Sequence, residues 1–203
     1  MCLKVQVFHL HHLLDRLCLE LVIERQSEGK KSFKITRDEI KLPDVPYYGM
    51  LQNKVGYVKL NSFTQTAASD VKSAIEKLQA QGMQELVLDL RGNGGGLLIE
   101  AVKIVNFFVA KNQVVVTTKG RVAEENRTYK TLEEPFAPNM PLVVLIDGGS
   151  ASASEILAGS LQDLDRAVVI GETSYGKGLV QRTYDLKYGS KIKITIAKYY
   201  TPS

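Results

Sequence analysis

Segments with strand and helix periodicity alternate along the chain from about residue 54 onward. Two nearly continuous apolar runs, 85–90 and 142–146, have the composition of buried strands, and a segment with helical spacing follows each of them. Alternation in this order is typical of βαβ units and of a parallel sheet. The pattern predicts an α/β domain in which the loops after the strands share one edge of the sheet.

The same periodicities predict where the individual elements lie. Helices are expected over 67–80, over 97–110 and from the serine-rich segment at 150–154 to about residue 161. Strands are expected over 55–60, 85–90, 114–118, 126–131, 142–146, 167–170, 180–186 and 191–197.

The first 53 residues have a different pattern. Residues 19–25 and 31–36 are short apolar and polar runs around the turn-forming residues 26–30, which predicts a β-hairpin. Leucines at helical spacing within 10–17 predict a short amphipathic helix. Residues 40–50, which contain two prolines, are expected to be a linker.

Composition narrows the chemistry. The 203 residues are 44% hydrophobic and 24% charged, which is typical of a globular protein. The net charge of +4 is the small difference between 26 basic and 22 acidic side chains. No basic run is interleaved with aromatics, so nucleic acid is not an expected partner. All three histidines and both cysteines lie within the first 18 residues. A histidine-dependent triad, a Cys-His dyad or a zinc site would need that stretch, whereas a serine-lysine pair would not.

Two turns that follow buried strands carry candidate chemistry. Residues 92–96 contain four glycines, which allow a turn to aim amides at an anion or a developing oxyanion. Residues 149–155 contain three alternating serines at the start of a helix, whose first amides carry partial positive charge. The alternatives are a tight turn without a ligand and serines that only cap the helix, and the pattern does not decide which serine acts.

Lys177 lies between glycines in residues 171–178 and is a candidate general base. A lysine has an ordinary pKa of about 10.4, so it acts as a base only where an apolar pocket without a carboxylate partner favours the neutral form. The alternatives are a solvated loop lysine and a P-loop. Residues 171–177 match G-x-x-x-x-G-K, but Gly178 replaces the metal-binding Ser or Thr and a strand follows, so a phosphate-binding function is the weaker hypothesis.

The sequence resembles the carboxy-terminal processing peptidases, or tail-specific proteases. Four stretches carry the resemblance, and they occur in the same order as in the family: 55–63, 88–96, 149–155 and 171–181. These are endopeptidases with a serine-lysine dyad. The sequence Tyr-Tyr-Thr-Pro at 199–202 extends the resemblance toward the end of the chain.

The resemblance implies specific roles for five residues. Ser152 would be the nucleophile, Lys177 its base, and Gln181 the residue whose amide orients the lysine. The oxyanion would be held by the amides of Ala153 and Gly95. No metal and no cofactor takes part in this chemistry.

The resemblance also implies the domain organisation. Residues 54–203 would be a protease core of ClpP/crotonase-like fold with βαβ units, truncated at its C-terminus relative to the family. Residues 37–53 would be a linker, and residues 1–36 a remnant resembling the end of a PDZ domain, the module that captures substrate C-termini by strand addition.

The function that the resemblance implies is a serine endopeptidase that cleaves near the C-termini of unstructured protein substrates. Family members usually act outside the cytoplasm, in the periplasm or cell envelope, although no targeting signal is recognised in this chain. Protein or peptide substrates are the expected partners, and homo-oligomerisation stays open. The alternative is a non-catalytic peptide-binding fragment of such a protease.

Overall fold

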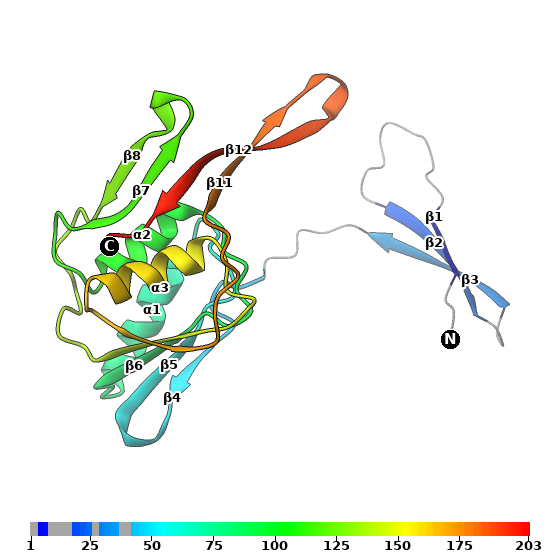
Figure 1. The fold of residues 1–203 in the computed structure, drawn as a ribbon. Coiled ribbons are helices and arrows are strands. Elements are labelled where there is room, and N and C mark those ends of the chain that lie inside the picture. Colours follow the sequence, from blue (N-terminus) through cyan, green and yellow to red (C-terminus); the bar gives the residue numbers. More distant parts are fainter. Residues whose placement is uncertain (1–3, 8–17, 26–28, 37–41) are drawn as a thin grey trace. The chain divides into compact units, whose positions relative to one another are not determined.

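The structure is a computed structural model that describes residues 4–7, 18–25, 29–36 and 42–203 (Figure 1). The chain divides into two units, Met1–Leu42 and Pro43–Ser203. In the first unit, β1 (Lys4–Val7), β2 (Cys18–Arg25) and β3 (Gly29–Thr36) form an antiparallel sheet. The pairing of β2 with β3 confirms the predicted hairpin, whereas β1 was not predicted. The helix expected within 10–17 lies outside the described residues.

A five-stranded sheet forms the centre of the second unit. Its order is β10-β9-β6-β5-β4, and the first four strands are parallel. Their bounds are β5 (Val55–Lys59), β6 (Glu85–Asp89), β9 (Leu142–Ile146) and β10 (Val168–Gly171). These strands lie within a residue or two of the predicted ones, so the expected βαβ arrangement is confirmed.

The linker predicted over 37–53 is wrong in part. Tyr47–Met50 form β4, which pairs antiparallel with β5 at the edge of the sheet. Asp44, in the same stretch, is buried, and its main-chain carbonyl accepts a hydrogen bond from the Asn61 amide. The Asp44 carboxylate accepts hydrogen bonds from three hydroxyl groups, those of Ser62, Thr64 and Thr66. This stretch is therefore part of the folded second unit.

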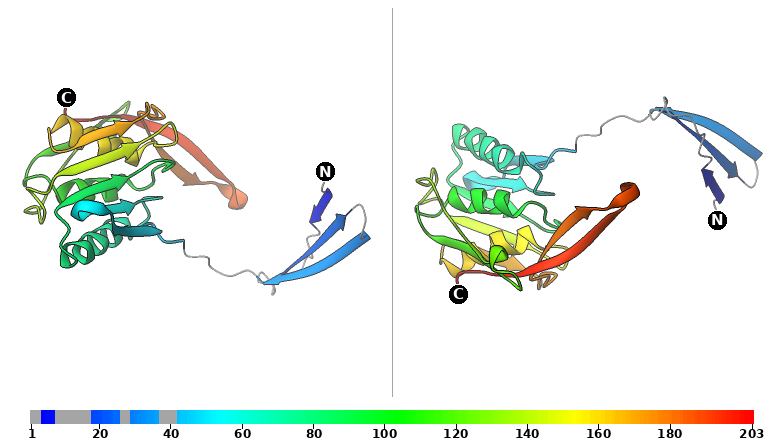
Figure 2. Two further views of the ribbon diagram at one scale, coloured as in Figure 1. Left: turned by 90° about the horizontal axis from the view of Figure 1, so that it is seen from below. Right: turned by 90° about the horizontal axis from the view of Figure 1, so that it is seen from above.

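Three helices lie against one face of this sheet, as Figures 1 and 2 show. They are α1 (Ala67–Ala80), α2 (Leu98–Asn106) and α3 (Ala153–Asp163). Under them, Val58, Leu88 and Val144 are neighbours by strand register and are fully buried. α2 ends before the predicted residue 110, because the carbonyls of Phe107 and Phe108 accept hydrogen bonds from the Ala137 amide and the Arg166 side chain instead.

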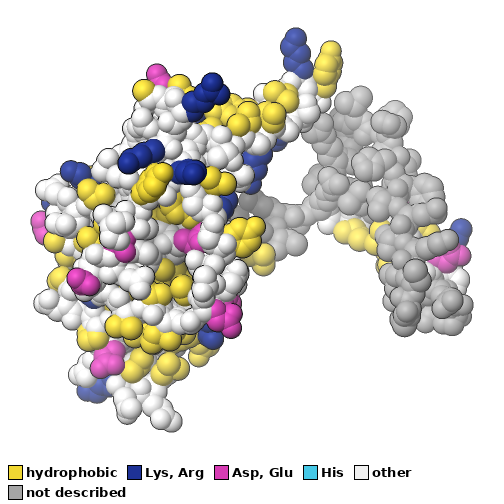
Figure 3. All heavy atoms as spheres, viewed as in Figure 1, with side chains coloured by type: hydrophobic (Ala, Val, Ile, Leu, Met, Phe, Trp, Pro, Cys, Tyr) yellow, Lys and Arg dark blue, Asp and Glu magenta, His cyan; other side chains and the backbone are white. Residues whose placement is uncertain are grey.

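A second, antiparallel sheet has the order β11-β12-β7-β8, and α2 and α3 both contact β7. Its strands are β7 (Val114–Gly120), β8 (Arg127–Lys130), β11 (Leu179–Asp185) and β12 (Lys191–Tyr200), with short 3-10 turns η1 (Gln52–Lys54), η2 (Ala123–Glu125) and η3 (Lys187–Gly189). The hairpin of β11 and β12, called the arm below, extends away from the rest of the second unit (Figure 2). Basic and hydrophobic side chains are exposed along it (Figure 3). None of the helices in the described residues is long and apolar enough to cross a membrane.

Candidate active site

The glycine turn (residues 92–96) follows β6, and the serine turn (residues 149–155) follows β9. Hydrogen bonds join the two turns. β6 and β9 are parallel neighbours, so the two turns leave the sheet at the same edge. The Gly92 amide donates to Oδ1 of Asp147 at 2.8 Å, and the Ala151 amide donates to the carbonyl of Asn93 at 3.0 Å. The expectation that these loops share one edge is confirmed.

The three serines of the serine turn differ in their burial and in their hydrogen-bond partners. Ser150 and Ser154 are fully buried. The Ser150 hydroxyl donates to the carbonyl of Leu90 at 2.8 Å, and the Ser154 hydroxyl donates to that of Asn93 at 2.9 Å. Ser152 is partly exposed and lines a pocket. Of the three hydroxyl groups, only that of Ser152 can meet a ligand there.

Ser152 has a strained backbone. Its φ of 59° and ψ of −112° are unusual for a residue with a side chain, and such a conformation costs about 1–3 kcal/mol that the surrounding structure must supply. The Ser152 amide donates to Oε2 of Glu155 at 2.7 Å, which helps to hold the turn. α3 starts at the next residue, Ala153, whose amide has no hydrogen-bond acceptor among the described residues. The turn presents a hydroxyl beside an amide at the positive end of a helix.

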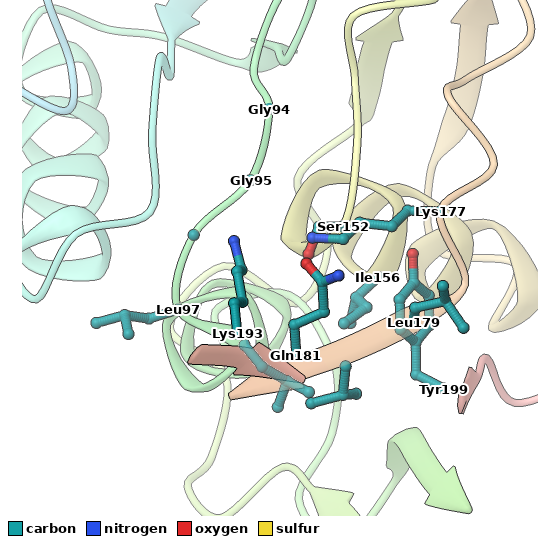
Figure 4. A pocket seen from close by; sticks show the side chains of 13 residues that line it. Gly94, Gly95, Leu97, Ser152, Ile156, Lys177, Leu179, Gln181, Lys193 and Tyr199 are labelled. Atoms are coloured by element: carbon teal, nitrogen blue, oxygen red, sulfur yellow. The ribbon is translucent and has the colours of Figure 1, made fainter. Parts of the chain in front are cut away.

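Ser152, Lys177 and Gln181 line one pocket of about 470 Å³. Figure 4 shows the ammonium end of Lys177 and the amide of Gln181 directed toward Ser152. The hydroxyl of Ser152 and the ammonium of Lys177 are not hydrogen-bonded in this structure, and catalytic hydrogen bonds often tighten only when substrate binds. The described lining residues are Gly94, Gly95, Gly96, Leu97, Leu98, Ser152, Ile156, Lys177, Leu179, Val180, Gln181, Lys193 and Tyr199.

The ammonium of Lys177 has no acidic partner among the described residues, which is one condition for a lysine base. Its side chain is half-buried, and no Asp or Glu belongs to the described lining of the pocket. Within residues 42–203 no carboxylate lies within ion-pair distance of its ammonium. Only the main-chain amide of Lys177 contacts an acid, donating to Oε2 of Glu155 at 3.1 Å.

Glu155 connects the serine turn to the loop of residues 171–178 that carries Lys177, called the lysine loop below. Its Oε1 accepts hydrogen bonds from the Ser174 hydroxyl and the Gly176 amide, and its Oε2 accepts from the amides of Ser152 and Lys177 and from the Tyr199 hydroxyl. Burial alone would raise the pKa of this carboxyl, but the surrounding donors hold it below its ordinary value. Glu155 is therefore held as an anion.

Tyr199 joins the same network from β12. Its hydroxyl donates to Oε2 of Glu155 at 2.8 Å and accepts a hydrogen bond from the Gly178 amide at 3.2 Å. The Tyr199 amide also donates to the Gly178 carbonyl at 3.1 Å. Burial, and then the adjacent Glu155 carboxylate, raise the pKa of Tyr199, so its hydroxyl stays protonated and can donate.

Gly95 lies directly against the serine turn. A Cβ built on it would sit 2.6 Å from the Ala151 carbonyl oxygen, 2.8 Å from Ser152 Cβ and 2.9 Å from the Ala153 nitrogen, and its φ is +96°. The Gly95 amide donates to Oδ1 of Asn93 at 2.9 Å. The oxyanion role expected for this amide stays a prediction, and it requires the turn to release that bond.

A charged cluster fixes the start of the glycine turn. Asp89 is buried and accepts two hydrogen bonds from the Arg91 guanidinium, at 2.8 and 3.0 Å, and one from the Tyr57 hydroxyl at 2.5 Å. Burial works against ionisation of Asp89, yet these donors keep its pKa well below the ordinary value. Within the described residues, no three His, Cys, Asp or Glu side chains are grouped so that they could hold a metal ion.

Comparison with known proteins decides the family. The family model described as peptidase family S41 matches residues 54–203, which is most of the chain. The chain belongs to peptidase family S41. The predicted membership among the carboxy-terminal processing peptidases is thereby confirmed, and the α/β fold of this S41 chain is that of its family.

Named relatives agree with this. A carboxyl-terminal-processing protease of Picosynechococcus sp. is 40% identical to this S41 chain over 181 residues, 87% of the chain and 42% of the relative. A probable CtpA-like serine protease of Staphylococcus aureus is 41% identical over 184 residues, 90% of the chain and 36% of the relative. The S41 chain thus spans less than half the length of these curated relatives.

A solved structure, the photosystem II D1 C-terminal processing protease, matches with a TM-score of 0.69 and 31% sequence identity. The match covers 91% of the S41 chain and 51% of that structure.

Within the S41 site, sequence reasoning missed the roles of Glu155, Tyr199 and Asn93. The spacing from Ser152 to Glu155 carries the signal of a capping box, whereas nothing local indicates Tyr199 or Asn93.

Proposed function

We propose that this S41 chain is the catalytic portion of a serine endopeptidase that cleaves near the C-termini of unstructured polypeptides. The observation that carries the proposal is the convergence of Ser152, Lys177 and Gln181 in one pocket whose described lining contains no acid. The strained backbone of Ser152 adds support, because strain of this kind gathers at functional sites.

The proposed reaction needs only side chains and amides of this chain. Ser152 Oγ attacks the peptide carbonyl while Lys177, in its neutral form, takes the hydroxyl proton and passes it to the leaving amine. Gln181 orients Lys177. The Ala153 amide stabilises the oxyanion, with Gly95 as the second donor. Water then attacks the acyl-enzyme, with Lys177 again as the base, and releases the second product.

The proposed function goes with a proposed domain organisation. We expect a ClpP/crotonase-like arrangement in residues 54–203 and a PDZ-derived segment in residues 1–36. Like its family, the protein would act outside the cytoplasm on protein or peptide substrates with unstructured ends.

Cleavage of an unstructured polypeptide with an apolar C-terminus, followed by mass spectrometry, tests the proposal. The parent, Ser152→Ala and Lys177→Ala are compared. The matched controls are Ser190→Ala and Lys187→Ala at the exposed tip of the arm. We expect the parent and both controls to cleave, and the two site variants to lose about a thousandfold or more of kcat.

Equal cleavage by all five proteins would rule out the proposed dyad. Binding of the polypeptide without cleavage, unchanged by Ser152→Ala, would favour the alternative of a non-catalytic peptide-binding fragment.

A further inference from the structure

The pocket contains a second lysine that the proposed reaction does not use. Of the described residues that line it, Lys177 and Lys193 are basic and none is acidic. The partial positive charge at the start of α3, beside Ser152, adds to the same field. Because Lys177 acts as the base in the proposed reaction, Lys193 is the lysine of the pocket whose charge is left for a ligand.

The arm aims Lys193 at the pocket. By strand register Lys193 faces Thr183 of β11, and two residues along the strands Gln181 faces Thr195. Residues two apart on a strand share a face, so Lys193 and Gln181 lie on the same face of the arm. Figure 4 shows the Lys193 side chain extending from β12 into the pocket. The opposite face carries Ile192 and Ile194.

Lys193 differs from other cations of the arm in its partners. Arg182 forms a bidentate ion pair with Glu125, and Lys191 forms an ion pair with Asp185 at 2.8 Å. No ion pair in the described part of the chain involves Lys193, which is exposed. Its charge is available to a bound ligand.

We propose that Lys193 binds a carboxylate of the polypeptide substrate and thereby sets a preference for acidic sequences beside the cleaved bond. This inference rests on the proposed function, since it assigns the substrate class of the same pocket. A carboxylate is the group that a cationic pocket without acidic lining attracts. It can come from an Asp or Glu side chain or from the end of a peptide chain, and the two sources are separable by experiment.

The test uses unstructured peptides of one sequence that carry Glu, Gln or Lys in turn at each position near the cleaved bond. Each is made with a free and with an amidated C-terminus. The ratio of kcat/KM for Glu to that for Gln is measured for the parent, Lys193→Ala, Lys193→Glu and the control Lys191→Ala. Lys191 lies on the same face of β12 but is already paired with Asp185.

We expect the parent and Lys191→Ala to prefer Glu at one position, or the free C-terminus, by about fivefold, the scale of an exposed ion pair. Lys193→Ala should bring this ratio near one, and Lys193→Glu should favour the Lys peptide instead. A parent that cleaves without any preference for a carboxylate, or a preference that survives in Lys193→Ala, would overturn the inference while leaving the proposed function intact.

A binding measurement tests the inference even if the protein cleaves none of these peptides. Fluorescently labelled versions of the same peptides are titrated against Ser152→Ala with and without Lys193→Glu. A carboxylate preference that Lys193→Glu abolishes supports the inference even if the proposed cleavage fails. Equal affinities for the Glu and Gln peptides, in both chain-end forms, overturn it.

Discussion

At the scale of single residues, the site depends on how closely two turns approach each other. Gly95 lies so near the serine turn that a Cβ would overlap Ala151 and Ser152. It would also fill the space beside the Ala153 amide, where the oxyanion is expected. The absence of a side chain at residue 95 therefore both permits the packing and keeps that space open.

Gly95→Ala should accordingly lower kcat/KM by about 100-fold, because displacement of the serine turn by a fraction of an ångström to an ångström misplaces the reacting groups. Gly94→Ala is the matched comparison, since a Cβ at residue 94 meets nothing within 4 Å. Peptide-cleavage kinetics and thermal unfolding of both variants check this. Similar losses in the two would show that the contact at residue 95 is not the cause.

At the scale of elements, one carboxylate joins three segments that are far apart in the sequence. Glu155 of α3 receives hydrogen bonds from the serine turn, from the lysine loop and from Tyr199 of β12. All five contacts come from donors, so an acceptor-only carboxylate fits the position and an amide does not. The network sets the position of Lys177 relative to Ser152 through main-chain contacts.

Replacement of Glu155 by Gln should lower kcat by about 100-fold with little change in KM, because an NH₂ group would face amide donors and shift the lysine loop. Tyr199→Phe, which removes one donor, should lower kcat by about tenfold. Tyr200→Phe, next to it on an exposed position, should match the parent. Steady-state kinetics and thermal unfolding separate the cases: a loss of stability with unchanged kcat would contradict this positioning role.

At the scale of the whole molecule, the folded state favours ionised carboxylates. Internal hydrogen bonds lower the pKa values of four carboxyls despite the opposing effect of burial, those of Asp89, Asp147, Glu155 and Asp163. The unfolded chain therefore binds more protons than the folded one in the acidic range. Their contribution to stability is present above the ordinary carboxyl pKa and is lost as the pH falls through the lowered, folded-state values.

The free energy of unfolding should consequently rise from about pH 2 to about pH 5 and then level off. Urea unfolding at a series of pH values measures it. Asp89→Asn should show a shallower rise, because one of the lowered groups is removed. A free energy of unfolding that stays constant across this range would contradict the assignment.

Most of the fold could be predicted because its signals are local. The apolar runs at 85–90 and 142–146 and the helical spacing of 67–80 act within a few residues. β4 escaped prediction because Tyr47 and Tyr48 are exposed and their segment lacks an apolar run. Its strand conformation comes from pairing with β5, which no local pattern encodes.

The site was predictable to the same extent. Glycines, serines and a lysine at turns after strands indicate chemistry by themselves. The contact between Glu155 and Tyr199 spans 44 residues and exists only because β12 pairs with β7. Likewise, burial decides that Ser150 and Ser154 hold the turns together while Ser152 faces the pocket.

The anchoring of Asp44 bears on how the protein should be trimmed for expression. The match to the family model begins at residue 54, yet Asp44 and β4 lie before it. A recombinant fragment cut at residue 54 would leave the hydroxyls of Ser62, Thr64 and Thr66 without their acceptor. It would also turn β5 into an open edge, which invites aggregation. A fragment that begins at Pro43 keeps both features, so the folding boundary lies upstream of the point where the match to the family model begins.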